Sequence, residues 1–333
     1  MTEKFIDLKN TNFTDLNKMQ VDFQSLVKEQ ISEFDKSYEI PQIVSKNPIS
    51  LSEASKKRKL YIQNKSIIFT NDISNLYTEI LSINLESFNF VKTFISKSNL
   101  ENNLQVNSNS FINNNHIFQI LTNNTEIKLS IKDFNNSLFK EYSCRIPNEI
   151  DFNNFDFCQD NGNTKERKII QKTYEFLQNI NNSNVAITSN FQNEKYFFTS
   201  GSYSKLIIKH DFDSSGQSIS DSERNNTLNT LALTSGGIGS ALYFLLSSNF
   251  ENSTIETFNS YASKNTVFTN GVLDKEFNHL SDKYVPQTID KIRNFLDNSF
   301  TYKNYTTFKT NNFFYIGYFY DVNKKYFFRK FSN

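Results

Sequence analysis

The chain has 333 residues, of which 37% are hydrophobic and 15% aromatic, and its 36 basic and 35 acidic residues leave a formal net charge of +1. A chain of this length can bury one large core or two ordinary ones, and its aromatic content excludes a mainly disordered protein. The balance of charge excludes a global field that would draw in nucleic acid or an anionic membrane, so any partner must be chosen by local patches.

About one residue in seven is Asn, beside 34 Phe and 16 Tyr but no Trp and only eight Gly. These abundant residues have AT-rich codons, so the bias indicates an AT-rich genome and makes short Asn-containing motifs weak evidence. Two cysteines, Cys144 and Cys158, are too few to stabilise a chain of this length by disulfide bonds. The first residues lack the pattern of a signal peptide. We therefore expect a reduced protein of the cytoplasm or of a virion, without a signal peptide.

The segment from Thr14 to Ser37 repeats apolar side chains at gaps of three and four, which predicts an amphipathic helix capped by Thr14. Its stripe resembles a short coiled-coil seam, so the helix is expected to pack either on its own domain or on a partner helix. The residues of this candidate partner-binding stripe are Leu16, Met19, Phe23, Leu26, Ile31 and Phe34.

The next segments change period along the chain. Apolar residues lie on one broad face between Ile73 and Ser96, which predicts a second long helix. Between residues 104 and 146, Ile127, Leu129 and Ile131 alternate with polar residues, which predicts short antiparallel strands joined by Asn-rich turns.

The Asn- and Asp-rich stretch from Ile146 to Thr164 predicts a domain boundary. The second half is then expected to contain a helix, three strands, a mainly helical region and a C-terminal hairpin, in that order. The corresponding residues are 165–179 for the helix, 185–189, 196–199 and 205–209 for the strands, 220–298 for the helical region, and 313–320 with 325–331 for the hairpin. We therefore predict an α+β fold in two domains: residues 1–155, a helical N-terminal region with a small antiparallel sheet, and residues 164–333, an antiparallel sheet with a helical middle.

Three of the eight glycines, Gly236, Gly237 and Gly239, lie between a possible strand and a possible helix, as in a turn that binds a dinucleotide. The third glycine of that motif is missing, so a kink between two buried helices is the competing interpretation. The uncharged segment from Leu231 to Leu246 is also a candidate for membrane insertion, although it is short and interrupted.

Asp211, Asp213 and Ser215 are spaced like the first ligands of a calcium loop, but the bidentate ligand at the twelfth position is missing. A turn before a helix explains the same residues. His210 stands beside them and is the first catalytic candidate only because no stronger one exists; His116 and His279 lack metal-ligand spacing. We assign no catalytic residue and no cofactor.

Two basic stretches are candidates for holding phosphates: Lys56 to Lys59, and the aromatic tail from Lys303 onward. The pattern in the tail has an alternative interpretation: the lysines would prevent the edge strand of a core hairpin from pairing with other chains. With no defensible active site, the sequence favours a non-catalytic structural or accessory subunit of a large protein assembly, such as a virion component or part of a bacterial machine. Its expected partners are other protein subunits or further copies of the chain itself. A nucleotide-dependent enzyme and a membrane-inserting protein are the alternatives.

Overall fold

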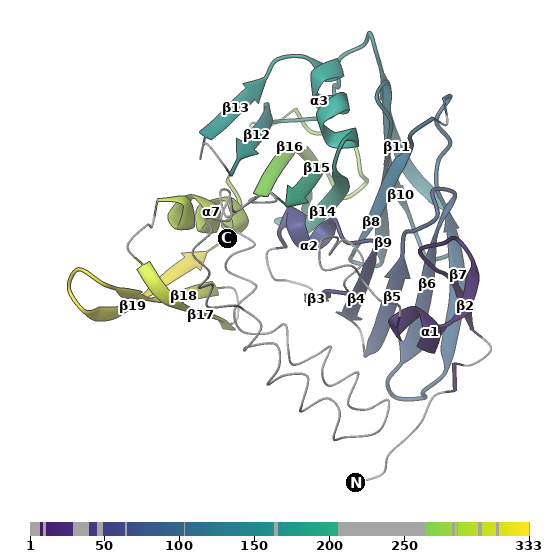
Figure 1. Ribbon diagram of the computed structural model, residues 1–333, viewed down its shortest axis with the longest axis horizontal. Coiled ribbons are helices and arrows are strands. Elements are labelled where there is room, and N and C mark those ends of the chain that lie inside the picture. Colours follow the sequence, from purple (N-terminus) through teal and green to yellow (C-terminus); the bar gives the residue numbers. More distant parts are fainter. Residues whose placement is uncertain are drawn as a thin grey trace, which may run out of the picture.

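The computed structural model describes residues 7–8, 11–28, 40–44, 49–63, 65–102, 104–162, 166–205, 264–281, 284, 286–298, 302–310 and 313–332 (Figure 1). Within these residues the chain forms nineteen β-strands and four short helices. The predicted α+β fold with a helical N-terminal region is therefore wrong, because the described protein is mostly antiparallel β-sheet.

The first sheet has five strands, and all neighbours are antiparallel except the first pair. In spatial order the strands are β3 (Gln42–Val44), β4 (Arg58–Gln63), β5 (Ser66–Asn71), β6 (Tyr77–Asn84) and β7 (Phe90–Ser96). Side chains on both faces of its middle strands are buried: Ile80 belongs to the main core, whereas the adjacent Leu81 packs against the N-terminal segment.

The predicted helix between Ile73 and Ser96 is wrong, since β6 and β7 form an antiparallel hairpin there. Because both faces of β6 are covered, neighbouring residues such as Ile80 and Leu81 are both buried. Apolar residues then no longer alternate with polar ones, and their spacing resembles that of a helix. The turn between the strands is made by Asn84, whose side chain accepts the backbone N–H groups of Glu86 and Ser87 at 2.9 Å each.

The predicted N-terminal helix is also wrong over most of its described length. The chain there forms the hairpin β1 (Asn12–Thr14) and β2 (Gln20–Asp22), followed by the short helix α1 (Phe23–Lys28). Asp15 makes the turn by accepting the N–H of Met19 at 2.7 Å, with Lys18 in the left-handed region at φ 61°. Local turn chemistry therefore overrides the apolar spacing.

The residues of the candidate partner-binding stripe point in different directions in the N-terminal hairpin and α1. Leu26 is buried and Phe23 partly buried against Phe69 of β5, Leu16 is half-buried, and Met19 is exposed. Ile31 and Phe34 lie outside the described residues. No continuous seam forms among the four residues of the stripe that are described.

The second and third sheets complete the main body. The second sheet, in chain and spatial order, consists of β8 (Asn107–Asn113), β9 (His116–Thr122), β10 (Glu126–Lys132) and β11 (Leu138–Arg145). The third sheet, in spatial order, consists of β13 (Glu166–Ile170), β12 (Phe157–Asn161), β16 (Lys264–Leu273), β15 (Lys195–Lys205) and β14 (Asn184–Gln192). The helices α2 (Leu51–Ala54) and α3 (Thr173–Asn181) pack on the third sheet.

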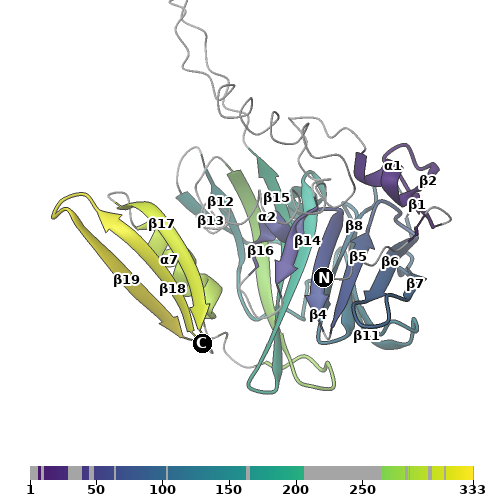
Figure 2. The same cartoon turned by 90° about the horizontal axis from the view of Figure 1, so that it is seen from below.

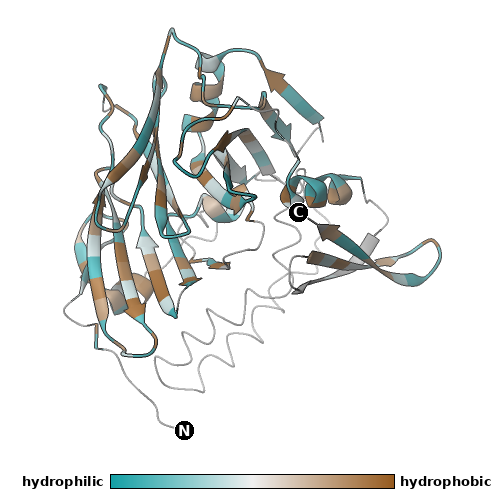
Figure 3. Ribbon diagram, turned by 180° about the vertical axis from the view of Figure 1, so that it is seen from behind, coloured by the Kyte–Doolittle hydropathy of each residue, from teal (hydrophilic) through white to brown (hydrophobic). Residues whose placement is uncertain are grey.

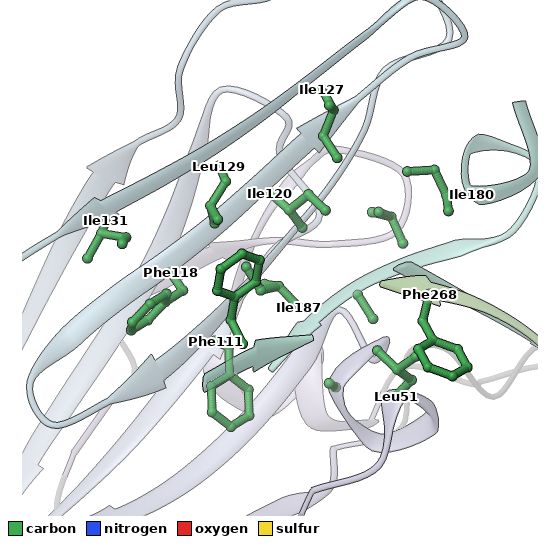
Figure 4. Packing of buried hydrophobic residues seen from close by; sticks show 14 of the residues in the cluster. Leu51, Phe111, Phe118, Ile120, Ile127, Leu129, Ile131, Ile180, Ile187 and Phe268 are labelled. Carbon is green, nitrogen blue, oxygen red and sulfur yellow. The ribbon is translucent and has the colours of Figure 1, made fainter. Parts of the chain in front are cut away.

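One continuous hydrophobic core joins these three sheets (Figure 4). Phe118 and Ile120 of β9 face residues such as Ile187 of β14, while Leu51 of α2 and Phe268 of β16 close the core from the side of the third sheet. This core contains residues from both sides of the predicted boundary, and the division into two domains stays a prediction.

The C-terminal residues form a smaller unit beside the third sheet (Figure 2). It consists of α7 (Thr288–Asp297) and the antiparallel C-terminal sheet, whose strands are β17 (Tyr302–Thr310), β18 (Phe313–Tyr320) and β19 (Lys325–Ser332). The predicted hairpin is confirmed, with Tyr320 opposite Lys325 at its turn. The predicted helical region 220–298 is correct for α7 and wrong for β16; the remainder lies largely outside the described residues.

Candidate functional site

Most residues that the sequence nominated for chemistry lie outside the described part of the chain. This holds for the glycine turn (Gly236, Gly237, Gly239), the calcium candidates (Asp211, Asp213, Ser215), His210 and the segment 231–246, all of which stay predictions. Among the residues that the structure does describe, no helix is both long and apolar enough to cross a bilayer. No three His, Cys, Asp or Glu side chains gather there as a metal site would require.

The remaining histidines and the cysteines make ordinary structural contacts. His116 lies 3.3 Å from the Tyr196 hydroxyl and His279 lies 2.9 Å from the Asn154 amide oxygen. Both cysteines are free and buried, and burial raises the pKa of each thiol to about 11. Neither thiol has the electropositive, accessible surroundings of a nucleophile.

The first basic run is buried instead of forming the exposed patch that the sequence suggested. It leads into β4, where alternate side chains point to opposite faces of the first sheet. Lys59 and Arg58 expose 0% and 1% of their surface, and Lys57 is half-buried. Lys57 and Lys59 lie on the core face, and Arg58 points to the opposite face, where its guanidinium lies 3.4 Å from the Leu26 carbonyl.

On the core face, two lysine side chains form ion pairs with one carboxylate. Lys59 and Lys97 place their Nζ atoms 3.5 and 3.0 Å from the carboxylate of Asp72, and all three side chains are completely buried. Lys57 donates to the Ser108 carbonyl at 2.5 Å beside them. We call Lys57, Lys59, Lys97 and Asp72 the lysine cluster; fully ionised, it would hold three positive charges against one negative charge.

Strand β8 supplies further hydrogen bonds to the cluster. Ser110 donates from its backbone N–H and its hydroxyl to Asp72 at 3.1 and 2.6 Å, and Thr78 of β6 donates to the other carboxylate oxygen at 2.7 Å. Lys97 also donates to the Ser108 hydroxyl at 3.0 Å. The cluster thus ties the first sheet to the second where the two meet.

Burial lowers the proton affinity of the amines. Burial, aided by the charge of Lys97, lowers the pKa of Lys57 to about 7, and burial lowers the pKa of Lys59 to about 8 and that of Lys97 below its ordinary value. Burial alone would raise the pKa of Asp72, but Lys97, Lys59 and the hydrogen bond from Ser110 hold it far below its usual range. The cluster can therefore present a neutral amine near neutral pH.

Asn109 of β8 lies against one of these amines and is itself fully buried. The Lys59 Nζ donates to its side-chain oxygen at 2.6 Å, and the N–H of Ser110 donates to the same oxygen at 2.8 Å. Its amide nitrogen donates to the carbonyls of Ser55 and Val185, both at 2.9 Å. Asn109 is thereby fixed between the first, second and third sheets.

Sequence reasoning missed this cluster because it treated a run of four basic residues as solvated. Alternation offered a usable signal: Lys57, Lys59 and Tyr61 lie two apart, as do Arg58 and Leu60, which is the period of a strand. The partners Asp72 and Asn109 come from distant segments, and no local pattern could bring them together.

A second site lies on the C-terminal sheet, whose two faces differ. Helix α7 covers one face. The residues that pack there are Ile292, Phe295 and Leu296 of α7 with Phe314, Ile316 and Phe331 of the sheet. On the other face, Tyr326 and Phe328 lie over Gly317, with their rings 5.3 Å apart and the Tyr326 hydroxyl 2.7 Å from that of Thr306. Phe328 exposes 63% of its surface and Tyr326 exposes 42%.

Strand β19 also carries basic side chains. Arg329 stacks over Phe295 at 4.7 Å and Lys330 lies over Phe313 at 3.4 Å, yet both basic residues are exposed. Among the described residues, β19 is an outer strand that pairs only with β18. We call the exposed side chains of β19 the C-terminal surface. Tyr326, Phe328 and Lys330 lie on the face away from α7, and Lys325, Phe327 and Arg329 lie on the face of α7. Figure 3 shows hydrophobic and hydrophilic residues mixed along this sheet.

The chain matches no protein-family model, and comparison with curated proteins finds no match. Two sites thus carry the functional argument: a buried lysine cluster that can supply a neutral amine, and an exposed surface of aromatic and basic side chains.

Proposed function

We propose that this protein is a non-catalytic structural or accessory subunit of a larger protein assembly, such as a virion component or part of a bacterial machine. The C-terminal surface is the observation that carries the proposal. Exposed aromatic side chains together with Arg are typical of the centres of protein interfaces, and large apolar side chains clustered on a surface mark sites of interaction. Phe328, with 63% of its surface exposed, is the expected anchor.

The charge of the C-terminal surface favours a partner subunit with an acidic edge or groove. Residues 321–332 contain four basic residues and one acid, Asp321, which is paired with Lys324 at 2.5 Å. An outer strand can accept a further strand through its backbone, with side chains providing the specificity. Two copies joined through β19 would oppose their own basic side chains, so a different subunit is the better fit.

The mass and composition of the native particle test this proposal. The particle would be extracted gently from its source, measured by light scattering, and its co-migrating chains identified by peptide mass spectrometry. We expect a defined complex with at least one other protein. A lone monomer or a small complex of this chain alone would contradict the proposal.

A further inference from the structure

We propose that Lys59 and Asn109 become joined by a covalent isopeptide bond between their side chains, formed by the protein itself inside the lysine cluster. The bond would cross-link β4 of the first sheet to β8 of the second. This inference concerns a modification of the folded chain and does not depend on the proposed function.

Proximity is the first argument. The Lys59 Nζ lies 2.6 Å from the Asn109 side-chain oxygen, and both residues are completely buried at positions fixed by neighbouring strands. Because folding holds the amine beside the amide, much of the entropy of bringing the two groups together has already been lost before Nζ approaches Cγ.

The state of the amine is the second argument. Only a neutral amine is a nucleophile, and burial lowers the pKa of Lys59 to about 8. At pH 7, roughly one molecule in ten then carries a neutral Lys59 amine, against roughly one in several thousand for an ordinary lysine. The carboxylate of Asp72 lies 3.5 Å from the Nζ and orients the amine.

Polarisation of the amide is the third argument. Attack on Asn109 Cγ places negative charge on the side-chain oxygen, where the N–H of Ser110 already donates at 2.8 Å. The amide nitrogen is held by the carbonyls of Ser55 and Val185, away from the attacking amine. The site thus separates the attacking nitrogen, the oxygen that gains charge and the leaving nitrogen.

The reaction balances without a co-reactant. The neutral Lys59 Nζ forms a bond to Asn109 Cγ, and one of its protons passes to the amide nitrogen, which shares the same carbon in the tetrahedral intermediate. The Cγ–Nδ2 bond then breaks, and the nitrogen leaves as ammonia with that proton. One amide is exchanged for another, and no group is oxidised or reduced.

Intact-mass spectrometry of the purified, folded full chain tests the proposal. The chain should be about 17 Da lighter than its sequence requires, because one ammonia is lost. Succinimide formation at Asn161–Gly162 or Asn270–Gly271 would cause the same loss, so the chain is also digested and the cross-link located by tandem mass spectrometry. We expect one branched peptide that joins Lys59 to Asn109.

Two variants serve as matched controls. Lys59→Arg keeps a positive charge but has no nucleophilic amine, so the branched peptide should disappear and the full mass return. Asn109→Asp retains a carbonyl carbon that Lys59 can attack, so it can form the same bond with loss of water in place of ammonia. A wild-type chain with its full mass and no branched peptide would overturn the proposal, as would a mass deficit located at another residue.

Discussion

At the scale of single residues, the buried lysines make the stability of the protein depend on pH. The folded-state pKa of Lys57 is about 7, far below the ordinary value of 10.5 that applies to the unfolded chain. Between pH 7 and 10 the unfolded chain therefore binds this proton more tightly than the folded chain, and the free energy of unfolding contributed by Lys57 rises with pH.

Lys57→Met is expected to flatten this dependence, because the variant has no proton to lose at that position. Urea denaturation at pH 7 and pH 9 measures it: the wild-type chain should gain more stability between the two values than Lys57→Met does. Equal gains in the two proteins would show that Lys57 does not titrate in this range.

Glu79 is a second buried charge with a structural role, on the opposite face of the first sheet. Its carboxylate accepts the Thr14 N–H at 2.9 Å and the Asn71 amide at 2.6 Å, and it pairs with Lys92 at 3.2 Å. Glu79→Ala leaves these donors without their acceptor and should lower the free energy of unfolding by about 3–5 kcal/mol. Limited proteolysis should then cut first in the N-terminal hairpin.

Glu86→Ala is the matched control for Glu79→Ala, measured by the same urea denaturation. The ion pair of Glu86 with Lys65 is exposed, and its loss should cost less than about 1 kcal/mol. Similar losses in the two variants would contradict the account of Glu79 as the tie between the hairpin and the sheet.

At the scale of elements, two glycines show what close packing requires. A side chain added at Gly201 would overlap the Val267 carbonyl oxygen and meet the backbone of Phe268 at 2.7 Å, so Gly201→Ala must push β15 from β16. At Gly317 it would meet the side-chain ends of Thr306, Tyr326 and Phe328 at 2.5–2.9 Å.

We therefore expect Gly201→Ala to cost about 1–3 kcal/mol or more, measured by thermal unfolding. Gly317→Ala should change stability less, because flexible side chains can move, while it displaces the anchor Phe328 and weakens partner binding. The opposite order of stabilities would contradict the packing described for the two strands.

The C-terminal unit has its own small core, in which Phe295 lies 5.2 Å from Tyr318 and 5.7 Å from Phe331. Phe295→Ala should destabilise this unit by about 3–5 kcal/mol. Hydrogen exchange should show lost protection in α7, β18 and β19 and unchanged protection in β9 and β10. Equal loss in both regions would mean that the two cores unfold together.

The sequence predicted best those elements whose pattern is set locally. The hairpin of β18 and β19 follows from two nearly continuous aromatic runs joined by a short polar turn. Strand β10 follows from the alternation of Ile127, Leu129 and Ile131 with polar residues. Helix α7 fell within a predicted helical region.

Other elements could not be predicted because distant contacts decide them. Ile80 and Leu81 are both buried only because the N-terminal hairpin covers the outer face of the first sheet, and this cover removes the alternation typical of a strand. The predicted helix Lys165–Asn179 is confirmed for residues 173–179, which lie in α3, and is wrong for residues 166–170, which form β13. Of the candidate sites, the C-terminal surface could be anticipated from its aromatic and basic composition. The lysine cluster could not, because it joins the start of β4 to the residues that follow β5 and β7.

At the scale of the whole molecule, the main body and the C-terminal unit contact each other through aromatic and basic side chains. Arg293 of α7 lies 5.2 Å above the ring of Phe268 in β16, and Arg167 of β13 lies 5.5 Å from the same ring. Tyr284 lies beside Phe155 and donates to Asp290 at 2.7 Å. These contacts hold the C-terminal sheet against the third sheet while the surface of β19 stays exposed.

Competitive incorporation into the native particle tests the central claim most directly. Wild-type chain, a chain with Phe328→Ser and Lys330→Glu, and a chain with the control substitution Leu104→Ser, which alters a residue exposed to 72%, would be expressed beside the native components and counted in purified particles. We predict that the control incorporates like the wild type and that the double variant is at least about tenfold depleted, since loss of one interface anchor costs about 2 kcal/mol or more. Equal incorporation of all three folded chains would contradict the assignment of β19 as the surface that binds the partner.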